Sequence, residues 1–204
     1  MDEEMDILKE VGMIAAAHGS IALSQILKTK IELSVPTTTI ISGNSMRGRI
    51  NLHKIGVAVS SRIATGMSGK VIFLLDEKNA YRLNDLSYRI QMDESMPMSL
   101  RTELGMSLIK EIGSMVSSAY VTAIGMMFDA VILLDPPSLV SGTIEDVLNV
   151  TVFSSLSSAQ EEVLLIDAEF CDSVHHLDGS FYLVLTADAA GEIRNVCRQR
   201  YHFD

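Results

Sequence analysis

One segment of this chain occurs twice. The first copy spans Asp6 to Leu27 and the second spans Ser107 to Phe128. Each copy contains one glutamate, and the two glutamates occupy equivalent positions. Aligning the copies on these glutamates brings further identical residues into register. A duplicated segment of this length restricts the chain to folds that are built from two similar halves. The identical pairs are Lys9/Lys110, Glu10/Glu111, Gly12/Gly113 and Ala22/Ala123.

Both copies are predicted to be long helices. Apolar residues recur three to four positions apart, and neither copy contains a proline. At 100° per residue these apolar positions share one side of each helix, which we expect to face a core. Glu10 and Glu111 fall on the opposite side. The expected core sides are Leu8, Val11, Ala15, Ala22 and Ile26 in the first copy, and Ile109, Ile112, Val116, Ala123 and Met127 in the second.

The neighbours of the two glutamates also match. In each copy a polar residue precedes the glutamate by one helical turn, another side chain follows it by one turn, and a proline comes after the helix at the same distance. Agreement at all these offsets indicates two equivalent outward-facing sites. The two sets are Asp6, Glu10, Met13 and Pro36, and Ser107, Glu111, Ser114 and Pro137.

These residues and spacings resemble the CheC family of chemotaxis proteins, which includes CheX and the flagellar-switch phosphatase FliY. The resemblance extends over nearly the whole chain. It implies that the helix docks into the active site of the phosphorylated response regulator CheY, where the glutamate pairs with a regulator lysine. An asparagine one turn after the glutamate would orient water toward the aspartyl phosphate. Magnesium would come from the regulator, so no cofactor or metal is expected on this chain.

The chain departs from the family pattern at this asparagine, because Met13 and Ser114 stand in its place. A carboxamide both accepts and donates hydrogen bonds, whereas a thioether is only a weak acceptor. A serine hydroxyl can do both but reaches less far, and misplacement by about 1 Å can cost on the order of a hundredfold in rate. We therefore expect the first site to be unable to orient water and the second to be weakened.

Two functions follow from the resemblance. The first is a protein aspartyl-phosphate phosphatase, a hydrolase of reduced activity that acts on phosphorylated CheY. The second is a binding module that has lost catalysis and holds phosphorylated CheY or the deamidase CheD, the family's other partner. A flagellar-switch role like that of FliY is disfavoured because such proteins carry an extra domain. The catalytic candidates are Glu10, Glu111 and Ser114, and the regulator-docking candidates are Asp6, Met13, Ser107, Pro36 and Pro137.

The expected fold is a single α+β domain over residues 1–204 with pseudo-twofold symmetry. It has a central mixed sheet and two long helices on one face. Repeat one covers about residues 5–90, repeat two about 100–187, and a terminal helix 188–201. Further helices are expected at 76–88 and 143–148, and strands at 30–42, 55–63, 69–75, 130–134, 150–155, 162–171 and 180–187.

Composition limits the partners. A net charge of −10 argues against nucleic acid, whose phosphates would be repelled, and no polybasic patch suits a membrane surface. The acidic start and the absence of a long uninterrupted apolar run argue against a secretory signal and a membrane span. We therefore expect a cytoplasmic protein with two reduced cysteines, although a disulfide between Cys171 and Cys197 stays open.

A group of metal-ligand residue types occurs near the end of the chain, at Asp172, His175, His176 and Asp178. Neighbouring histidines in a hairpin turn point in different directions and lack the spacing of zinc sites. We therefore expect a solvated turn here and no metal site.

Overall fold

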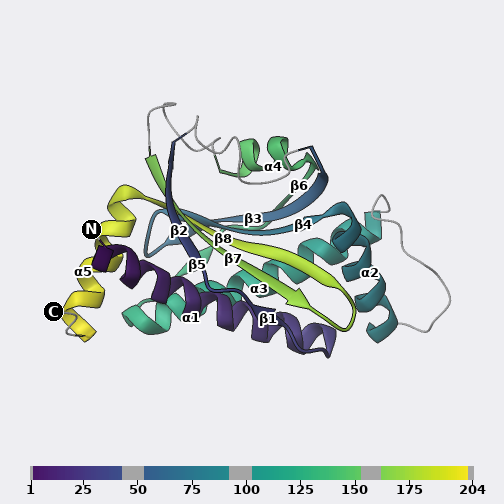
Figure 1. The fold of residues 1–204 in the computed structure, drawn as a ribbon, viewed down its shortest axis with the longest axis horizontal. Helices are drawn as coiled ribbons and strands as arrows, with labels where there is room; N and C mark the ends of the chain where they lie inside the picture. Colours follow the sequence, from purple (N-terminus) through teal and green to yellow (C-terminus); the bar gives the residue numbers. More distant parts are fainter. Residues whose placement is uncertain (1, 43–52, 92–102, 153–161, 202–204) are drawn as a thin grey trace.

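The computed structural model describes residues 2–42, 53–91, 103–152 and 162–201, and it repeats one order of elements (Figure 1). The second half follows the order of the first, with one helix added. The first half contains α1 (Asp2–Leu27), β1 (Glu32–Leu33), β2 (Thr37–Ser42), β3 (Ile55–Thr65), β4 (Gly69–Asp76) and α2 (Glu77–Gln91). The second half contains α3 (Glu103–Phe128), β5 (Leu133–Leu134), β6 (Ser138–Thr143), α4 (Ile144–Thr151), β7 (Glu162–Asp172), β8 (Leu177–Thr186) and α5 (Ala187–Tyr201).

The strands form one eight-stranded sheet in the order β1-β7-β8-β4-β3-β5, with β2 also paired to β7 and β6 to β3. The α+β fold is confirmed, but the expectation of a mixed sheet was wrong. All pairings among the described strands are antiparallel. Short turns make β3–β4 and β7–β8 antiparallel hairpins. A twofold axis through the sheet between β4 and β8 then makes the central pair antiparallel as well.

Strand register supports this pseudo-twofold relation. A pairing in one half recurs in the other between residues at equivalent positions, so the symmetry extends to individual residue pairs and not only to the order of elements. Thr37 pairs with Asp167 as Ser138 pairs with Ser60, and Leu33 pairs with Phe170 as Leu134 pairs with Ile63.

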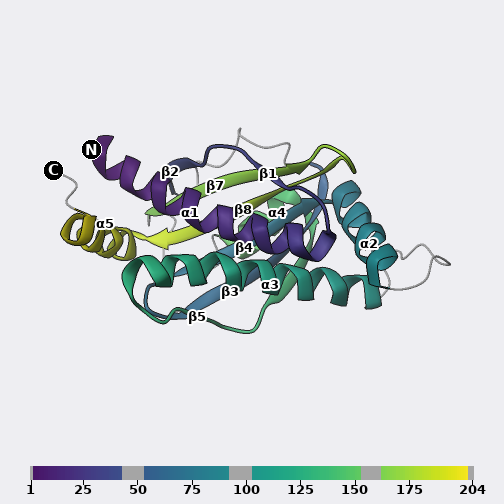
Figure 2. The ribbon, with the colours of Figure 1, turned by 90° about the horizontal axis from the view of Figure 1, so that it is seen from below.

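The two long helices α1 and α3 lie side by side on one face of the sheet (Figure 2). Their apolar sides face the strands, as expected, and bury the main core. The opposite face of the sheet is covered in part by α4, which buries a second and smaller apolar cluster with Ile72 and Leu74. Fully buried residues of the main core include Leu8, Leu23, Ile109, Ile112, Phe73, Phe170 and Phe181.

One described helix, Met5–Leu27 within α1, is long and apolar enough to cross a membrane by length and composition alone. In the structure, 44% of its most apolar window is buried, because the helix packs on α3 and the sheet. A helix in the core of a packed domain passes the same test.

Three of the expected strands differ in the structure. The segment expected as one strand at 30–42 is divided into β1 and β2, and Pro36 lies between them. The segment expected as a strand at 130–134 pairs only over β5, and a separate strand, β6, begins after Pro137. The strand expected at 150–155 was wrong at its start, because Val150 and Thr151 belong to α4, and residues 153–155 lie outside the described part. The Thr143 hydroxyl accepts a hydrogen bond from the Asp146 amide at 3.2 Å and so caps the start of α4.

Glycines allow the long helices to approach the sheet closely. A Cβ atom added at Gly113 would lie 2.6 Å from Cβ of Val59, and one added at Gly12 would collide with Ile166. Gly12 and Gly113 are equivalent in the duplication, as are the strands β3 and β7 that they contact. Since Val59 and Ile166 are β-branched and buried, neither side chain has much freedom to move away.

We expect Gly113→Ala to lower the free energy of unfolding by about 1–2 kcal/mol. The overpacking cost lies in the upper part of the usual range, at about 2–3 kcal/mol, because the added Cβ would lie within 2.9 Å of three Val59 atoms. It exceeds the gain in helix propensity of about 1 kcal/mol. Urea denaturation would measure the change. Gly191→Ala in α5 is the matched control, because its added Cβ would meet only Arg194 at 3.7 Å. That control should be neutral or stabilising. A Gly113→Ala protein as stable as wild type would show that β3 can shift away from α3 at little cost in free energy.

One carboxylic acid is partly buried on the α4 side of the sheet. Asp167 in β7 pairs with Thr37 on one side and Tyr182 on the other, and its Oδ1 atom is buried without a hydrogen-bond partner. Burial, and secondarily the charge of Glu169, raises the pKa of Asp167 to about 7. The folded protein therefore holds this proton more tightly than the unfolded chain does.

It follows that the free energy of unfolding should fall as pH rises through the interval between the ordinary pKa of an aspartate, about 4, and about 7. Asp167→Asn should flatten this dependence and stabilise the protein above pH 7. Urea midpoints at several pH values from 5 to 8 would measure it. Glu162→Gln, an exposed carboxylate of the same strand, is the control. Parallel profiles for wild type and Asp167→Asn would contradict the expectation.

Candidate functional site

The second set of motif residues comes together at the surface of α3. Residues spaced three to four apart share the outward face of this helix, and Pro137 from the segment between β5 and β6 lies beside them. Together they line an open hollow of about 620 Å³. All motif residues of the second copy are in this lining, which consists of Ser107, Lys110, Glu111, Ser114, Met115, Ser118 and Pro137.

Polarity is unevenly distributed in this hollow. The Glu111 side chain is exposed, and Ser114, one turn further on, is half-buried. The Ser118 hydroxyl donates to the Ser114 carbonyl at 2.8 Å and is therefore engaged with the helix backbone. The hollow thus presents one carboxylate and one ammonium group, from Glu111 and Lys110, beside short polar side chains and the thioether of Met115.

The position of Pro137 depends on how the chain leaves α3. Asp129 adopts a left-handed backbone conformation with φ of 51°, and the Ala130 amide donates to the Gly125 carbonyl at 2.9 Å, which ends the helix. The chain then returns along α3 and is held to β3. The Arg62 guanidinium binds the Asp135 carboxylate at 2.7 Å. These contacts bring Pro137 next to the glutamate's turn of the helix.

The first set of motif residues is arranged differently. Glu10 is exposed, as expected, and Asp6 is exposed and paired with Lys9 at 3.2 Å. Met13 is half-buried and Pro36 is buried, whereas Pro137 is half-buried at the edge of its hollow. The duplication therefore supplies two outward glutamates, but their surroundings at the surface are not equivalent.

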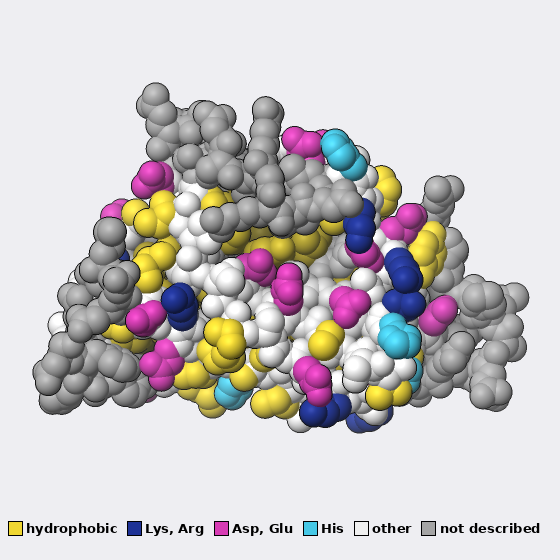
Figure 3. Space-filling model, in the orientation of Figure 1, with side chains coloured by type: hydrophobic (Ala, Val, Ile, Leu, Met, Phe, Trp, Pro, Cys, Tyr) yellow, Lys and Arg dark blue, Asp and Glu magenta, His cyan; other side chains and the backbone are white. Residues whose placement is uncertain are grey.

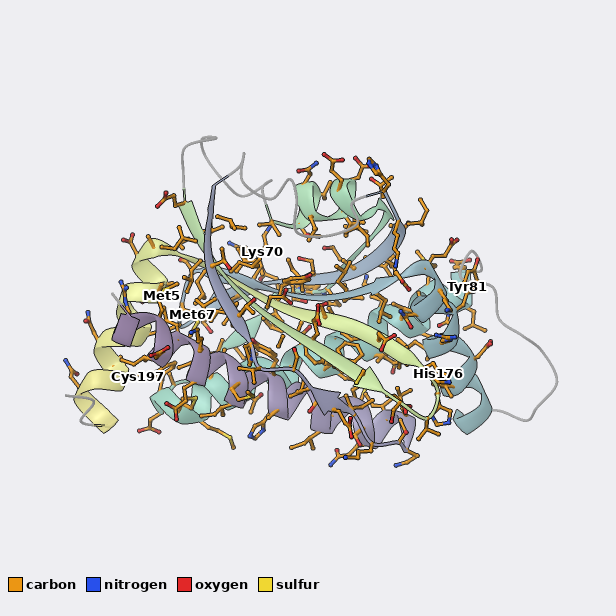
Figure 4. All side chains as sticks on the ribbon, in the orientation of Figure 1. Met5, Met67, Lys70, Tyr81, His176 and Cys197 are labelled. Carbon is orange, nitrogen blue, oxygen red and sulfur yellow. The ribbon has the colours of Figure 1, made fainter. Side chains whose placement is uncertain are left out.

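The helix α5 also lies near the first glutamate. Cys197 of α5 is buried beside the first turns of α1 (Figure 4). Burial, and secondarily the negative charge of Glu10, raises the pKa of the Cys197 thiol. Cys171 and Cys197 are both free thiols.

The expected solvated turn near the chain end was wrong at one residue. The Asp172 side chain is buried and organises the β7–β8 turn by accepting from the amides of Val174 at 2.9 Å and His175 at 3.2 Å. Its other oxygen lies 2.6 Å from Nδ1 of His175. His176, at the tip of the hairpin beside α2 (Figure 4), accepts from Arg82 through its carbonyl. Within the described residues, no group of three or more potential ligands could hold a metal ion.

A second hollow lies on the face of the sheet away from the long helices. It has a volume of about 420 Å³ and an apolar floor that includes Leu74, Ile144 and Tyr182. Figure 3, which looks at the edge of the sheet formed by β1, β2 and β7, shows acidic side chains spread over this view. Asp76 at the rim is engaged with Lys54 at 3.6 Å and with the amide of Asn79 at 2.8 Å. The sequence motifs did not indicate this hollow, because its residues come from strands and loops distant in the chain.

Comparison with known proteins found relatives in sequence. No family model matches the chain. The CheY-P phosphatase CheC of Bacillus subtilis is 23% identical over 190 residues, which are 92% of this chain and 89% of that protein. The flagellar motor switch phosphatase FliY of the same organism is 22% identical over 82% of this chain, a match that spans 42% of FliY.

Solved structures show the same fold. Thermotoga maritima FliY superposes with a TM-score of 0.78 at 20% identity and covers 98% of both chains. CheX in its complex with CheY, BeF3 and magnesium from Borrelia burgdorferi gives a TM-score of 0.50 at 15% identity, over 86% of this chain and 96% of that chain. The sequence matches and the shared fold support the CheC and FliY family, which the helix motifs had indicated.

Proposed function

We propose that this chain is a CheC-type chemotaxis signalling protein that docks on phosphorylated CheY and promotes weak hydrolysis of its aspartyl phosphate. The observation that carries the proposal is the hollow on α3, because it unites the motif residues of the second copy around Glu111. The match to a CheY-P phosphatase along 92% of the chain supports the same reading. So does the shared fold with a CheX that binds CheY. Such a protein would work in the cytoplasm.

The proposed chemistry relies on positioning. Water adds to phosphorus while the aspartyl oxygen leaves, which releases inorganic phosphate and restores the regulator's carboxylate. The exposed carboxylate of Glu111 would hold a regulator lysine and so fix the docked geometry. The Ser114 hydroxyl, one turn away, could hydrogen-bond the attacking water, but from closer to the helix than an amide would reach. Magnesium would belong to the regulator, and no residue of this chain is assigned to it.

The two glutamates should contribute unequally. Glu10 has no hydroxyl or amide one turn further on, because Met13 stands there, and its equivalent proline is buried. We expect Glu111→Ala to reduce the acceleration of phosphate release by about tenfold or more, and Glu10→Ala to change it by less than about twofold. The measurement is the decay of phosphorylated CheY with and without each variant. Equal effects from both substitutions would show that the two sites work alike.

Placing an asparagine at position 114 offers a sharper test. Ser114→Asn should raise the rate of phosphate loss by about tenfold, because a carboxamide can both accept from water and donate to it. Ser173→Asn makes the same substitution in the exposed turn between β7 and β8, outside the hollow and off α3, and should leave the rate unchanged. No gain from Ser114→Asn in a protein that still binds the regulator would mean that water is oriented by another group.

A second candidate is a binding module that holds phosphorylated CheY, or the deamidase CheD, without hydrolysis. The observation that favours it is that neither motif set places a carboxamide one turn after its glutamate. In that case wild-type protein would bind CheY better in the presence of beryllofluoride and magnesium but would not shorten the lifetime of the aspartyl phosphate.

A further inference from the structure

The exposed face of α3 carries three large apolar side chains. Leu104, Met115 and Met126 are 61%, 52% and 69% exposed. They stand eleven positions apart, and at 3.6 residues per turn such a spacing returns to the same helix face within about 20°. We call these three residues the α3 apolar stripe.

The stripe is continuous with the candidate site. Met115 lines the hollow together with Glu111, and Leu104 and Met126 lie beyond its two ends. At 1.5 Å per residue, the stripe extends for about 33 Å along the helix. The three side chains stand about three turns apart, with Glu111 and short polar side chains between them. A partner that covers the whole face would bury all three.

The equivalent face of α1 lacks this stripe. In the duplication, Leu104, Met115 and Met126 correspond to Glu3, Ile14 and Gln25. Ile14 is half-buried and Gln25 is polar and exposed. Among the described side chains of α1, Ile21 is the one large apolar residue that is strongly exposed, at 53%. The two helices therefore differ in their exposed apolar residues as they do in their motif residues. The outward face of α3 carries the stripe, and the equivalent positions of α1 do not.

We propose that the α3 apolar stripe belongs to the docking surface, and that the phosphorylated receiver domain of the regulator lies along the length of α3 with Glu111 near the middle of the contact. This inference rests on the proposed function. A compact domain of about 100 residues has a radius of gyration of about 13 Å and hence a width of roughly 34 Å. One such domain matches the length of the stripe.

The chemistry of the stripe suits this partner better than a second copy of the chain. Methionine side chains adapt to the shape of an apolar partner surface. Self-pairing would bring together two chains that each carry a net charge of −10. The stripe therefore supplies apolar contacts on both sides of Glu111. The ion pair of Glu111 with the regulator would fix the position of the regulator along α3.

The test is a binding measurement with the double variant Leu104→Gln/Met126→Gln, both of which lie outside the hollow. Calorimetry would measure affinity for CheY loaded with beryllofluoride and magnesium. We expect the double variant to bind about tenfold more weakly or worse, with an unchanged melting temperature because both side chains are exposed. Ile21→Gln is the matched control, an equally exposed apolar residue on α1, and should bind like wild type.

Full affinity in the double variant, or an equal loss in Ile21→Gln, would overturn the inference. If Glu111→Ala abolishes binding while the double variant does not, the stripe is refuted and the proposed function stands. If wild type does not prefer loaded over unloaded CheY, both are refuted. Analytical sedimentation of the protein without CheY tests for self-association through the stripe. A dimer that the double variant dissociates, with unchanged regulator affinity, would assign the stripe to self-association and overturn the inference.

Discussion

Close packing of two helices on the sheet sets the orientation of everything that α1 and α3 present to solvent. Gly12 meets Ile166 of β7 and Gly113 meets Val59 of β3, at separations that leave no room for a Cβ atom. Each glutamate stands two positions before its glycine, which is about 200° around the helix. A helix seated on the sheet at its glycine must therefore turn its glutamate away from the core, and both Glu10 and Glu111 are exposed.

The pseudo-twofold arrangement places Glu10 and Glu111 at equivalent positions, but the surfaces around the two glutamates differ. Pro36 is buried, whereas Pro137 borders the hollow on α3. Exposed apolar residues accompany Glu111 along α3 and are absent at the equivalent positions of α1. The repeat accounts for the shared scaffold, and differences at a few surface residues mean that, in the described part of the chain, the hollow on α3 unites a full set of motif residues.

This division fits a chemistry that depends on placement. Hydrolysis of an aspartyl phosphate needs a partner held in register more than it needs a reactive side chain. Under the proposed function, a rigid helix with a carboxylate at its centre and exposed apolar side chains on both sides would hold a partner, even if the group that orients water is a short hydroxyl. Under the same proposal, docking and catalysis could weaken independently, since Glu111 is assigned to docking and Ser114 to the attacking water.

The sequence by itself determined the elements whose signals are local. Periodicity identified the two long helices and their buried sides, the matching offsets identified Glu10 and Glu111 as outward residues, and the repeat indicated a symmetric α+β fold. The tertiary structure alone decided strand direction, the extension of α4 through Thr151, the burial of Asp172, and the different fates of Pro36 and Pro137. Periodicity reports how residues within one segment share a face. Burial, strand pairing and the shape of a surface depend on contacts between segments that are far apart in the chain, and no local pattern records them.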